Sequence, residues 1–329
     1  YAPDTWTALV THLTRRGATD EELLTAGLAT RASTGRLIDR FRDRVLFPIT
    51  REEKILGFVG RRHPDATDTD RRGPKYLNTG DTLLYRKGDQ LYTAGDTSAL
   101  KSGLATPVLV EGPMDAIAIT LAGQGRYLGV AALGTSLTTD QARQLATWPA
   151  TPIIATDNDP AGQLAAERDF WLLTPHKLDP LAITLPPGYD PASLYATLGS
   201  RQLTHALNQA VPIGGQLLHR VLTNQQTPDI NKILNLIAAR PEAAWADALD
   251  SATPYLPEAP QSLVARLLTA THAWTTDSMA NAHRQLEAPR TPPSPASRRP
   301  SRAIEVTTIQ PLNRDAPQPP SGSVIDVTQ

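Results

Sequence analysis

Two groups of acidic residues, each directly after an apolar run, are the residues of this chain best suited to chemistry. Glu111 follows the apolar run 107–110, and Asp157 and Asp159 follow the run 151–156. Small, glycine or proline residues come next in both places, and a helical pattern then begins. Ligands of open α/β sheets collect outside the carboxyl ends of the strands, so these carboxylates are expected to meet at one edge. Carboxylates that converge repel one another unless cations lie between them, and Mg²⁺ prefers hard oxygen ligands together with phosphates. The pattern predicts metal-assisted chemistry on phosphates.

Two further aspartates are candidates for the same edge. Asp115 belongs to the first turn of the helix that follows Glu111, and Asp190 follows the fourth expected strand. Asp157 and Asp159 are two positions apart, so on an extended backbone their side chains would share one face. Such a pair can bridge two metals about 4 Å apart and hold both oxygens of an in-line phosphoryl displacement. Aspartate is also common in turns, which is the competing interpretation for Asp190.

Alternating strands and helices are expected to position these acids. From about residue 106 the pattern predicts strands at 107–111, 127–132, 152–157 and 181–185, and helices at 113–123, 138–147 and 161–172. Alternation of this kind implies right-handed crossovers and a mostly parallel sheet that is covered on both faces. Helices are expected further on at 200–210, 213–223, 229–238, 241–250 and 260–285.

The part of the chain before residue 106 has a different pattern. Residues 4–29 predict two short helices, and residues 44–60 predict a hairpin with strands 45–49 and 55–59. A charged loop is expected at 61–74, and short extended pieces are expected around 76–77 and 83–85.

Composition restricts the class of protein. The chain has 329 residues, a length that allows two or three packed units, and its net charge is −1. It has no cysteine, which excludes disulfides and thiolate zinc sites within these residues. Neither a secretion leader nor a membrane-spanning run is indicated, and a first residue Tyr1 suggests a piece of something longer. Residues 31–90 hold 14 Lys/Arg against 9 Asp/Glu, a surplus that favours contact with phosphate polymers but is also common on solvated surfaces.

Other motifs in the sequence indicate no further catalytic or metal site. The seven histidines lack zinc-ligand spacing, and neither a phosphate-binding P-loop nor a serine nucleophile elbow occurs. Nine prolines among residues 288–329 predict a disordered tail or a linker.

With these residues assembled, the chain resembles the Toprim module and, more closely, the RNA-polymerase core of bacterial DnaG-type primases. Residues 110–115 (VEGPMD) resemble the glutamate motif of Toprim, and residues 157–162 (DNDPAG) resemble its Asp-x-Asp motif. Toprim is shared with topoisomerases and some nucleases. The stretches that resemble the amino-terminal subdomain of the primase core are 39–49, 57–61, 74–78 and 85–88.

The resemblance implies a function and a set of site residues. It implies an α/β Toprim sheet in a cytoplasmic enzyme that makes RNA primers on single-stranded DNA from ribonucleoside triphosphates, with a replicative helicase as a partner and no membrane contact. Two Mg²⁺ or Mn²⁺ ions would be held by Glu111, Asp115, Asp157, Asp159 and Asp190, of which Glu111, Asp157 and Asp159 would be catalytic. Template and nucleotide would be bound by Arg40, Arg42, Lys75, Asn78 and Lys87. The expected parts are an amino-terminal subdomain (1–105), the Toprim domain (106–198), a helical subdomain (199–285) and the tail (286–329).

Departures from the family pattern keep two alternatives open. The family carries a cysteine-ligated zinc domain, which would have to lie upstream of Tyr1 or be absent, and a second acid usually stands where this chain has Ala192. One alternative is a Toprim nuclease or topoisomerase-like enzyme, although no separate domain with a tyrosine nucleophile is apparent. The other is a non-catalytic, primase-like DNA-binding module.

Overall fold

The computed structural model describes residues 1–52, 54–63, 73–134, 136–224, 229–256 and 262. The chain divides into two units, Tyr1–Glu287 and Ala288–Gln329, and the description below concerns the first of them. Apart from residue 262, the helix expected at 260–285 and the tail expected from 286 lie outside the described residues.

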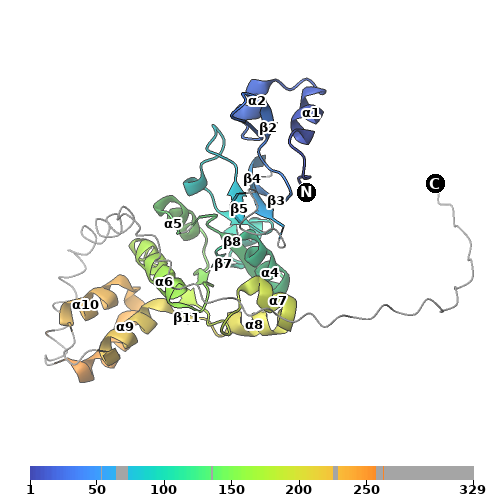
Figure 1. The fold of residues 1–329 in the computed structure, drawn as a ribbon. Coiled ribbons are helices and arrows are strands. Elements are labelled where there is room, and N and C mark those ends of the chain that lie inside the picture. The colour runs from blue at the N-terminus through green and yellow to red at the C-terminus, as the bar shows by residue number, and fades with distance from the viewer. Residues whose placement is uncertain (53, 64–72, 135, 225–228, 257–261, 263–329) are drawn as a thin grey trace, which may run out of the picture. The chain divides into compact units, whose positions relative to one another are not determined.

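A six-stranded sheet forms the centre of this unit (Figure 1). Its order is β11 (Val211–Pro212), β10 (Leu181–Ala182), β9 (Ile153–Ile154), β7 (Thr106–Val110), β8 (Tyr127–Ala131) and β6 (Tyr92–Thr93). The four inner strands are parallel, and the two outer strands pair antiparallel with their neighbours. The prediction of a mostly parallel sheet is confirmed.

Helices cover both faces of the sheet because its strands are apolar on both sides. Val108 and Val110 of β7 pack into one buried cluster, whereas Leu109 packs into the other. On the first face lie α4 (Pro113–Gly123), α7 (Pro191–Leu198) and α8 (Ser200–Asn208), and on the second lie α5 (Thr139–Ala146) and α6 (Pro160–Leu173) (Figure 1). Gly129 of β8 allows α4 to approach closely, since a Cβ there would lie 2.1 Å from the carbonyl oxygen of Ala116.

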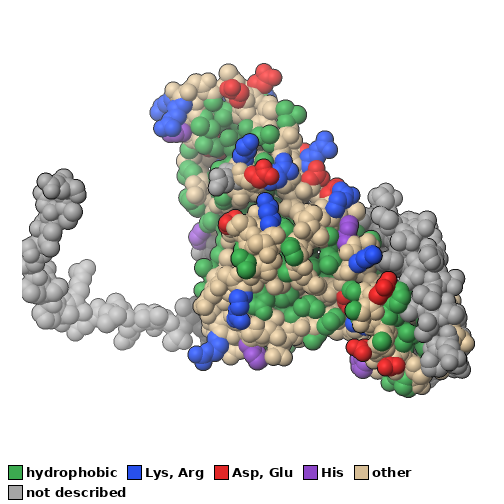
Figure 2. Space-filling model, turned by 180° about the vertical axis from the view of Figure 1, so that it is seen from behind, with side chains coloured by type: hydrophobic (Ala, Val, Ile, Leu, Met, Phe, Trp, Pro, Cys, Tyr) green, Lys and Arg blue, Asp and Glu red, His purple; other side chains and the backbone are tan. Residues whose placement is uncertain are grey.

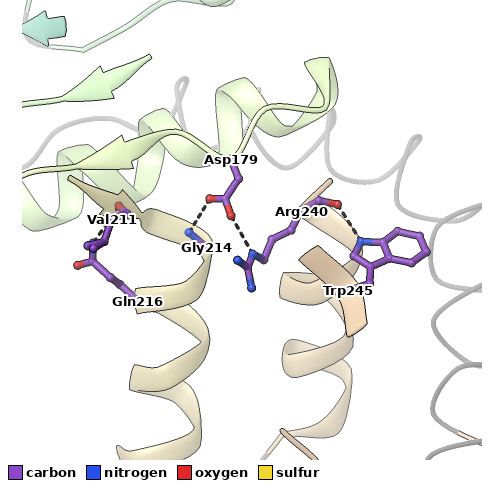
Figure 3. A network of polar contacts seen from close by, with 6 residues as sticks. All are labelled: Asp179, Val211, Gly214, Gln216, Arg240 and Trp245. Atoms are coloured by element: carbon purple, nitrogen blue, oxygen red, sulfur yellow. Dashed lines mark hydrogen bonds and ion pairs between the residues drawn. The ribbon is translucent and has the colours of Figure 1, made fainter. Parts of the chain in front are cut away.

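The helical part beyond the sheet packs against the α6 side. It consists of α9 (Ile213–Asn224), α10 (Ile230–Ala239), α11 (Trp245–Ala252) and the short 3₁₀ helices η2 (Thr174–His176), η3 (Glu242–Ala244) and η4 (Thr253–Tyr255). A buried ion pair joins it to the sheet: Asp179, just before β10, accepts 2.8 Å hydrogen bonds from the Gly214 N–H and from Arg240 Nε (Figure 3). The indole of Trp245 donates to the Arg240 carbonyl oxygen at 2.8 Å.

The amino-terminal part is built around a long hairpin. Its elements are α1 (Ala8–Thr14), α2 (Asp20–Thr25), β1 (Ala29–Arg31), β2 (Leu37–Asp39), β3 (Arg44–Arg51), β4 (Lys54–Arg62), β5 (Tyr76–Asn78), η1 (Lys87–Asp89) and α3 (Ser98–Lys101). Strands β3, β4 and β5 form an antiparallel sheet, and β1 pairs with β2. The buried Asp39 carboxylate caps α1, since its oxygens accept from the N–H groups of Leu9 and Val10 at 2.9 Å.

Several expected boundaries are wrong. The strands expected at 152–157 and 181–185 contain only two residues each, and each is preceded by a proline (Pro152 and Pro180), which lacks an N–H for the ladder. In the hairpin, Arg51 pairs with Lys54, so the expected four-residue loop is a tighter turn. Residues 83–85 form no strand, whereas α7, the β1–β2 hairpin and β6 were not expected.

None of the described helices combines the length and apolar composition that a bilayer crossing requires.

Candidate active site

The five predicted acids lie at the carboxyl edge of the parallel sheet, on four neighbouring elements. Glu111 directly follows β7, and Asp115 is in the first turn of α4. Asp157 lies in the loop between β9 and α6, Asp159 is the N-cap of α6, and Asp190 is the N-cap of α7. The sheet therefore brings together acids that are up to 79 positions apart in the sequence (190 − 111).

The Asp-x-Asp pair is arranged differently from the expectation. Asp157 and Asp159 are not on an extended strand, because β9 ends at Ile154 and the Asp159 N–H donates to the Asp157 carbonyl oxygen at 2.8 Å in a turn. The turn depends on Gly162, because a Cβ there would lie 2.0 Å from that same carbonyl oxygen. Proline at the first position of α6 and the Asp159 cap then fix where the helix begins.

Three of the acids are also tied to the backbone. Asp159 Oδ1 accepts from the Gly162 N–H at 2.7 Å, and Asp190 Oδ1 accepts from the Ser193 N–H at 2.6 Å. Asp115 Oδ1 accepts from the Ala192 N–H at 3.2 Å. The carboxylates are thus held in place by α6 and α7, which leaves their second oxygens for other partners.

Burial and mutual repulsion raise the pKa of several of these groups. The pKa of Asp115 is raised to about 6, first by burial and then by the charge of Asp190. The pKa of Asp157 is raised by burial, then by Asp190 and Asp159. Although the Glu111 side chain reaches solvent, burial of its carboxylate is the largest cause that raises its pKa, followed by the charges of Asp157 and Asp159. A cation placed among these groups would relieve the repulsion.

The five acidic side chains have the kind of ligand atoms that bind hard divalent cations. All five side chains offer carboxylate oxygens, which are the ligands that Mg²⁺ prefers. Within the described ranges, however, no three acidic or histidine side chains lie close enough together to hold one metal ion. The chemistry of the donors therefore fits a divalent cation, but their present positions do not enclose one.

Of the predicted basic residues, Lys75 lies nearest to the acids. Its charge lowers the pKa of both Glu111 and Asp157, and its carbonyl oxygen accepts from the buried Arg44 at 3.3 Å. The side chain of Lys87 is exposed on η1, close to Gly134 in the loop that follows β8. Lys75 therefore belongs to the acidic edge, and Lys87 flanks it.

The remaining predicted residues, Arg40, Arg42 and Asn78, make contacts with other parts of the protein. Arg40 donates through Nε and Nη2 to the Asn78 carbonyl oxygen at 3.0 and 2.7 Å. Asn78 Nδ2 donates to the Leu133 carbonyl oxygen at 2.9 Å, which joins β5 to the loop after β8. Arg42 donates to the Asp39 carbonyl oxygen and lies over the ring of Trp6, 4.1 Å from its centroid. Asn78 therefore connects β5 to the loop after β8, and Arg40 holds Asn78 in place. Arg42 lies on the α1 side.

The sequence has a basic surplus in residues 31–90, but on the described part of the face in Figure 2 the Lys and Arg side chains do not gather into one patch. Lys and Arg side chains are spread over this face, with Asp and Glu side chains between them. The net charge of the segment alone therefore does not locate a nucleic-acid surface.

Tyr76 and Arg61 belong to the site but were not singled out from the sequence. The Tyr76 hydroxyl lies against the turn after Glu111, where a Cβ on Gly112 would be 3.1 Å from the hydroxyl oxygen. The pKa of Tyr76 is raised by burial and then by Asp115, while Arg61 lowers it by its charge and a hydrogen bond. The signal that could have located them is their place beside Gly60 and Lys75 in the primase-like stretches.

A cavity of about 360 Å³ opens beside the acids and was also not foreseen. Its lining includes Glu111, Asp157 and Asp159 together with Ser136, Arg168 and Asp169. Asp169 follows Ala161 and Ala165 on the stripe of α6 that lines the cavity. A charged residue on an otherwise small and apolar helix stripe is the sequence signal that was overlooked.

Comparison with known families agrees with this geometry. Residues 1–98 match the family model of the N-terminal domain of the DNA primase catalytic core. Residues 108–195 match a Toprim-like family model. The sheet with its acidic edge is therefore a Toprim-like domain, preceded by a primase-type subdomain.

Individual proteins and solved structures that are similar to this chain are DNA primases. The DNA primase of Clostridium acetobutylicum is 34% identical over 239 residues, which cover 72% of this chain and 38% of that protein. The solved catalytic core of the Escherichia coli primase is 31% identical, with a TM-score of 0.63 over 78% of this chain and 84% of that one. A DnaG primase catalytic domain bound to single-stranded DNA is 30% identical, with a TM-score of 0.62 over 76% and 80%.

This chain belongs to the DnaG-type DNA primase family, of which it has the catalytic-core fold. It spans about two fifths of the length of the curated relatives that it matches. Toprim domains and primase cores bind divalent metals as a class.

Proposed function

We propose that this chain is the polymerising core of a primase, which synthesises short RNA primers on single-stranded DNA from ribonucleoside triphosphates. The observation that carries the proposal is the acidic edge of the Toprim-like sheet, where the charge of Lys75 acts on Glu111 and Asp157. Carboxylates for cations and a lysine for phosphate, in one place, are what nucleotidyl transfer requires.

The cations in this proposal are two Mg²⁺ or Mn²⁺ ions, held by Glu111, Asp157 and Asp159 with support from Asp115 and Asp190. Bound there, they would activate the primer 3′-hydroxyl and neutralise the departing pyrophosphate. Lys75 attracts the triphosphate to the edge, because it is the exposed cation nearest the acids.

Template binding is assigned to the amino-terminal part. Lys87, Arg40, Arg42 and Asn78 are proposed to guide the DNA strand and the nucleotide, with Arg40 and Asn78 acting by fixing β5 against the loop after β8. Each expected part has a proposed role. Residues 1–105 bind template and nucleotide, and residues 106–198 carry out catalysis. Residues 199–285 support the catalytic domain, and residues 286–329 act as a tail or linker. A replicative helicase as partner and a cytoplasmic location belong to the same proposal.

Primer synthesis with a matched pair of variants tests this proposal. The assay uses the full chain, a single-stranded template, labelled ribonucleotides and Mg²⁺ or Mn²⁺, with Asp157→Ala beside Asp250→Ala as the control. Asp250 is an exposed aspartate of α11, far along the chain from the acids. We expect short RNA from the wild type and Asp250→Ala but none from Asp157→Ala, with DNA binding retained in all three. Polymerisation by Asp157→Ala would refute the metal assignment.

The non-catalytic binding module remains the second candidate, because the described acids do not surround a single point and Ala192 stands where an acid is usual. It predicts salt-sensitive DNA binding without turnover in any of the three proteins. Metal-dependent degradation of labelled single-stranded DNA would instead indicate a Toprim nuclease.

A further inference from the structure

The cavity beside the acids has the dimensions and walls of a small-molecule site. Its volume of about 360 Å³ is within the range of roughly 300–1,000 Å³ that is usual for ligand pockets. It lies between α6 and the loop after β8, and its apolar or small lining residues include Leu109, Ala132, Leu137, Ala161 and Ala165. Such walls suit a flat heterocycle better than a phosphate.

The wall also carries a carboxylate without a protein partner. Asp169 is only 7% exposed and lines the cavity, yet it makes no hydrogen bond or ion pair with any described residue. Because Asp169 lines the cavity, its carboxylate oxygens can accept hydrogen bonds from a ligand that carries donors. Burial raises the pKa of Asp169 to about 7, and the charge of Arg168 opposes this effect. The group is therefore mostly an ionised acceptor at pH 8.

Arg168 supplies donors next to this acceptor. Its Nη1 donates to Ser136 Oγ at 3.1 Å across the cavity, and its Nε donates to the Leu164 carbonyl oxygen at 3.4 Å. These two bonds hold the guanidinium at the wall while other N–H groups stay available, since arginine has five donors.

A carboxylate beside a guanidinium distinguishes among the nucleobases. Guanine alone presents two adjacent donors, N1–H and the N2 amino group, which match the two oxygens of one carboxylate, and its O6 acceptor lies next to them. Adenine and cytosine offer one amino donor beside an acceptor nitrogen, and uracil offers one N–H between two carbonyl groups.

We propose that this cavity binds the guanine base of the ribonucleotide that starts the RNA chain, with Asp169 accepting from N1–H and N2–H and Arg168 donating to O6. The proposal rests on the proposed primase function. Because Glu111 and Asp157 line the same cavity, a nucleoside whose base pairs with Asp169 would carry its ribose toward these acids, where the 3′-hydroxyl must react. Elongation uses all four nucleotides at the incoming position, so a guanine-selective cavity serves the first nucleotide rather than the incoming one.

Nucleotide binding without template tests this inference separately from catalysis. Affinities of the full chain for GTP, ATP, CTP, UTP and xanthosine triphosphate are measured by calorimetry with Mg²⁺ at pH 8. We expect GTP to bind the wild type at least about tenfold more tightly than ATP, CTP or UTP, since one or two hydrogen bonds to a charged group distinguish them. Asp169→Ala should remove this preference and leave ATP binding unchanged, whereas Asp250→Asn should retain it.

A second variant reverses the specificity instead of abolishing it. Xanthine carries a carbonyl group where guanine has its N2 amino group, so Asp169→Asn, which can donate to that oxygen and accept from N1–H, should prefer xanthosine triphosphate to GTP. A merely structural role of Asp169 would not produce this exchange. Equal binding of all nucleotides by the wild type would overturn the inference while leaving primer synthesis intact, as would an Asp169→Asn variant that still prefers GTP. Failure to bind any nucleotide without template would also overturn the inference, and primer synthesis by the same protein would then show that the proposed primase function stands.

Discussion

The buried ion pair between Asp179 and Arg240 is expected to contribute more to stability than any exposed pair of the same chemistry. Replacing Arg240 by methionine keeps most of the aliphatic side chain but removes the Nε donor, 2.8 Å from Asp179 Oδ2. The two side chains are only 12% and 7% exposed, and the carboxylate would retain the Gly214 N–H as its hydrogen-bond donor (Figure 3). Breaking a buried pair in this way costs about 3–5 kcal/mol, because an uncompensated charge remains in the interior.

The chain contains a matched exposed pair as control. Arg143 and Asp140 on α5 are 2.6 Å apart, but their side chains are 65% and 54% exposed, so Arg143→Met should cost at most about 1 kcal/mol. Urea unfolding followed by far-ultraviolet circular dichroism gives the free energy of unfolding of both variants and the wild type. If both variants lost the same free energy of unfolding, the argument from burial would be refuted. Arg240→Met should still bind DNA like the wild type, because the pair lies away from the acidic edge.

Three further predictions concern single residues. Gly162→Ala should abolish nucleotide incorporation while DNA binding persists, since its Cβ would lie 2.0 Å from the Asp157 carbonyl oxygen; normal incorporation would contradict the proposed role of the turn. Asp169→Asn should leave stability at pH 4 nearly unchanged but stabilise the chain by about 2–4 kcal/mol at pH 8.5 in urea unfolding. The reason is that a folded pKa of about 7, above the ordinary 3.8, contributes stability that is full below pH 3.8 and is lost as the pH rises through 7. Asp39→Ala should lower the free energy of unfolding by about 2 kcal/mol, because the N–H groups of Leu9 and Val10 lose their acceptor; a change below 0.5 kcal/mol would exclude this capping role.

The parallel sheet could be predicted because its buried strands are apolar runs that alternate with helical stretches bounded by Gly, Pro and capping residues. Glu111 could be placed at the end of β7 for the same reason. The short strands β9 and β10 could not be delimited, since the apolar run continues through Ala155 although the ladder ends at Ile154. Strands this brief are set by their neighbours in the sheet, and local sequence carries no record of that pairing.

The acids of the candidate site could be named from the sequence, but their local geometry could not. The convergence of Glu111 with Asp157 follows from parallel strand topology, whereas the cap geometry of Asp159 depends on the turn that Gly162 permits. The polar wall of the cavity was missed because Arg168 and Asp169 read as ordinary charges on a helix. Only the packing of α6 against the loop after β8 shows that Asp169 is buried.

The backbone bonds of the acids also bear on the choice between magnesium and calcium. Asp115, Asp159 and Asp190 each give one carboxylate oxygen to a backbone N–H, and two of these bonds cap α6 and α7. Calcium takes six to eight oxygens and commonly engages both oxygens of a carboxylate, whereas magnesium takes single oxygens and keeps several waters. A calcium ion could recruit both oxygens of these aspartates only by unfastening the first turns of two helices. If these acids bind metal as proposed, the capping of α6 and α7 at this edge would therefore favour magnesium over calcium.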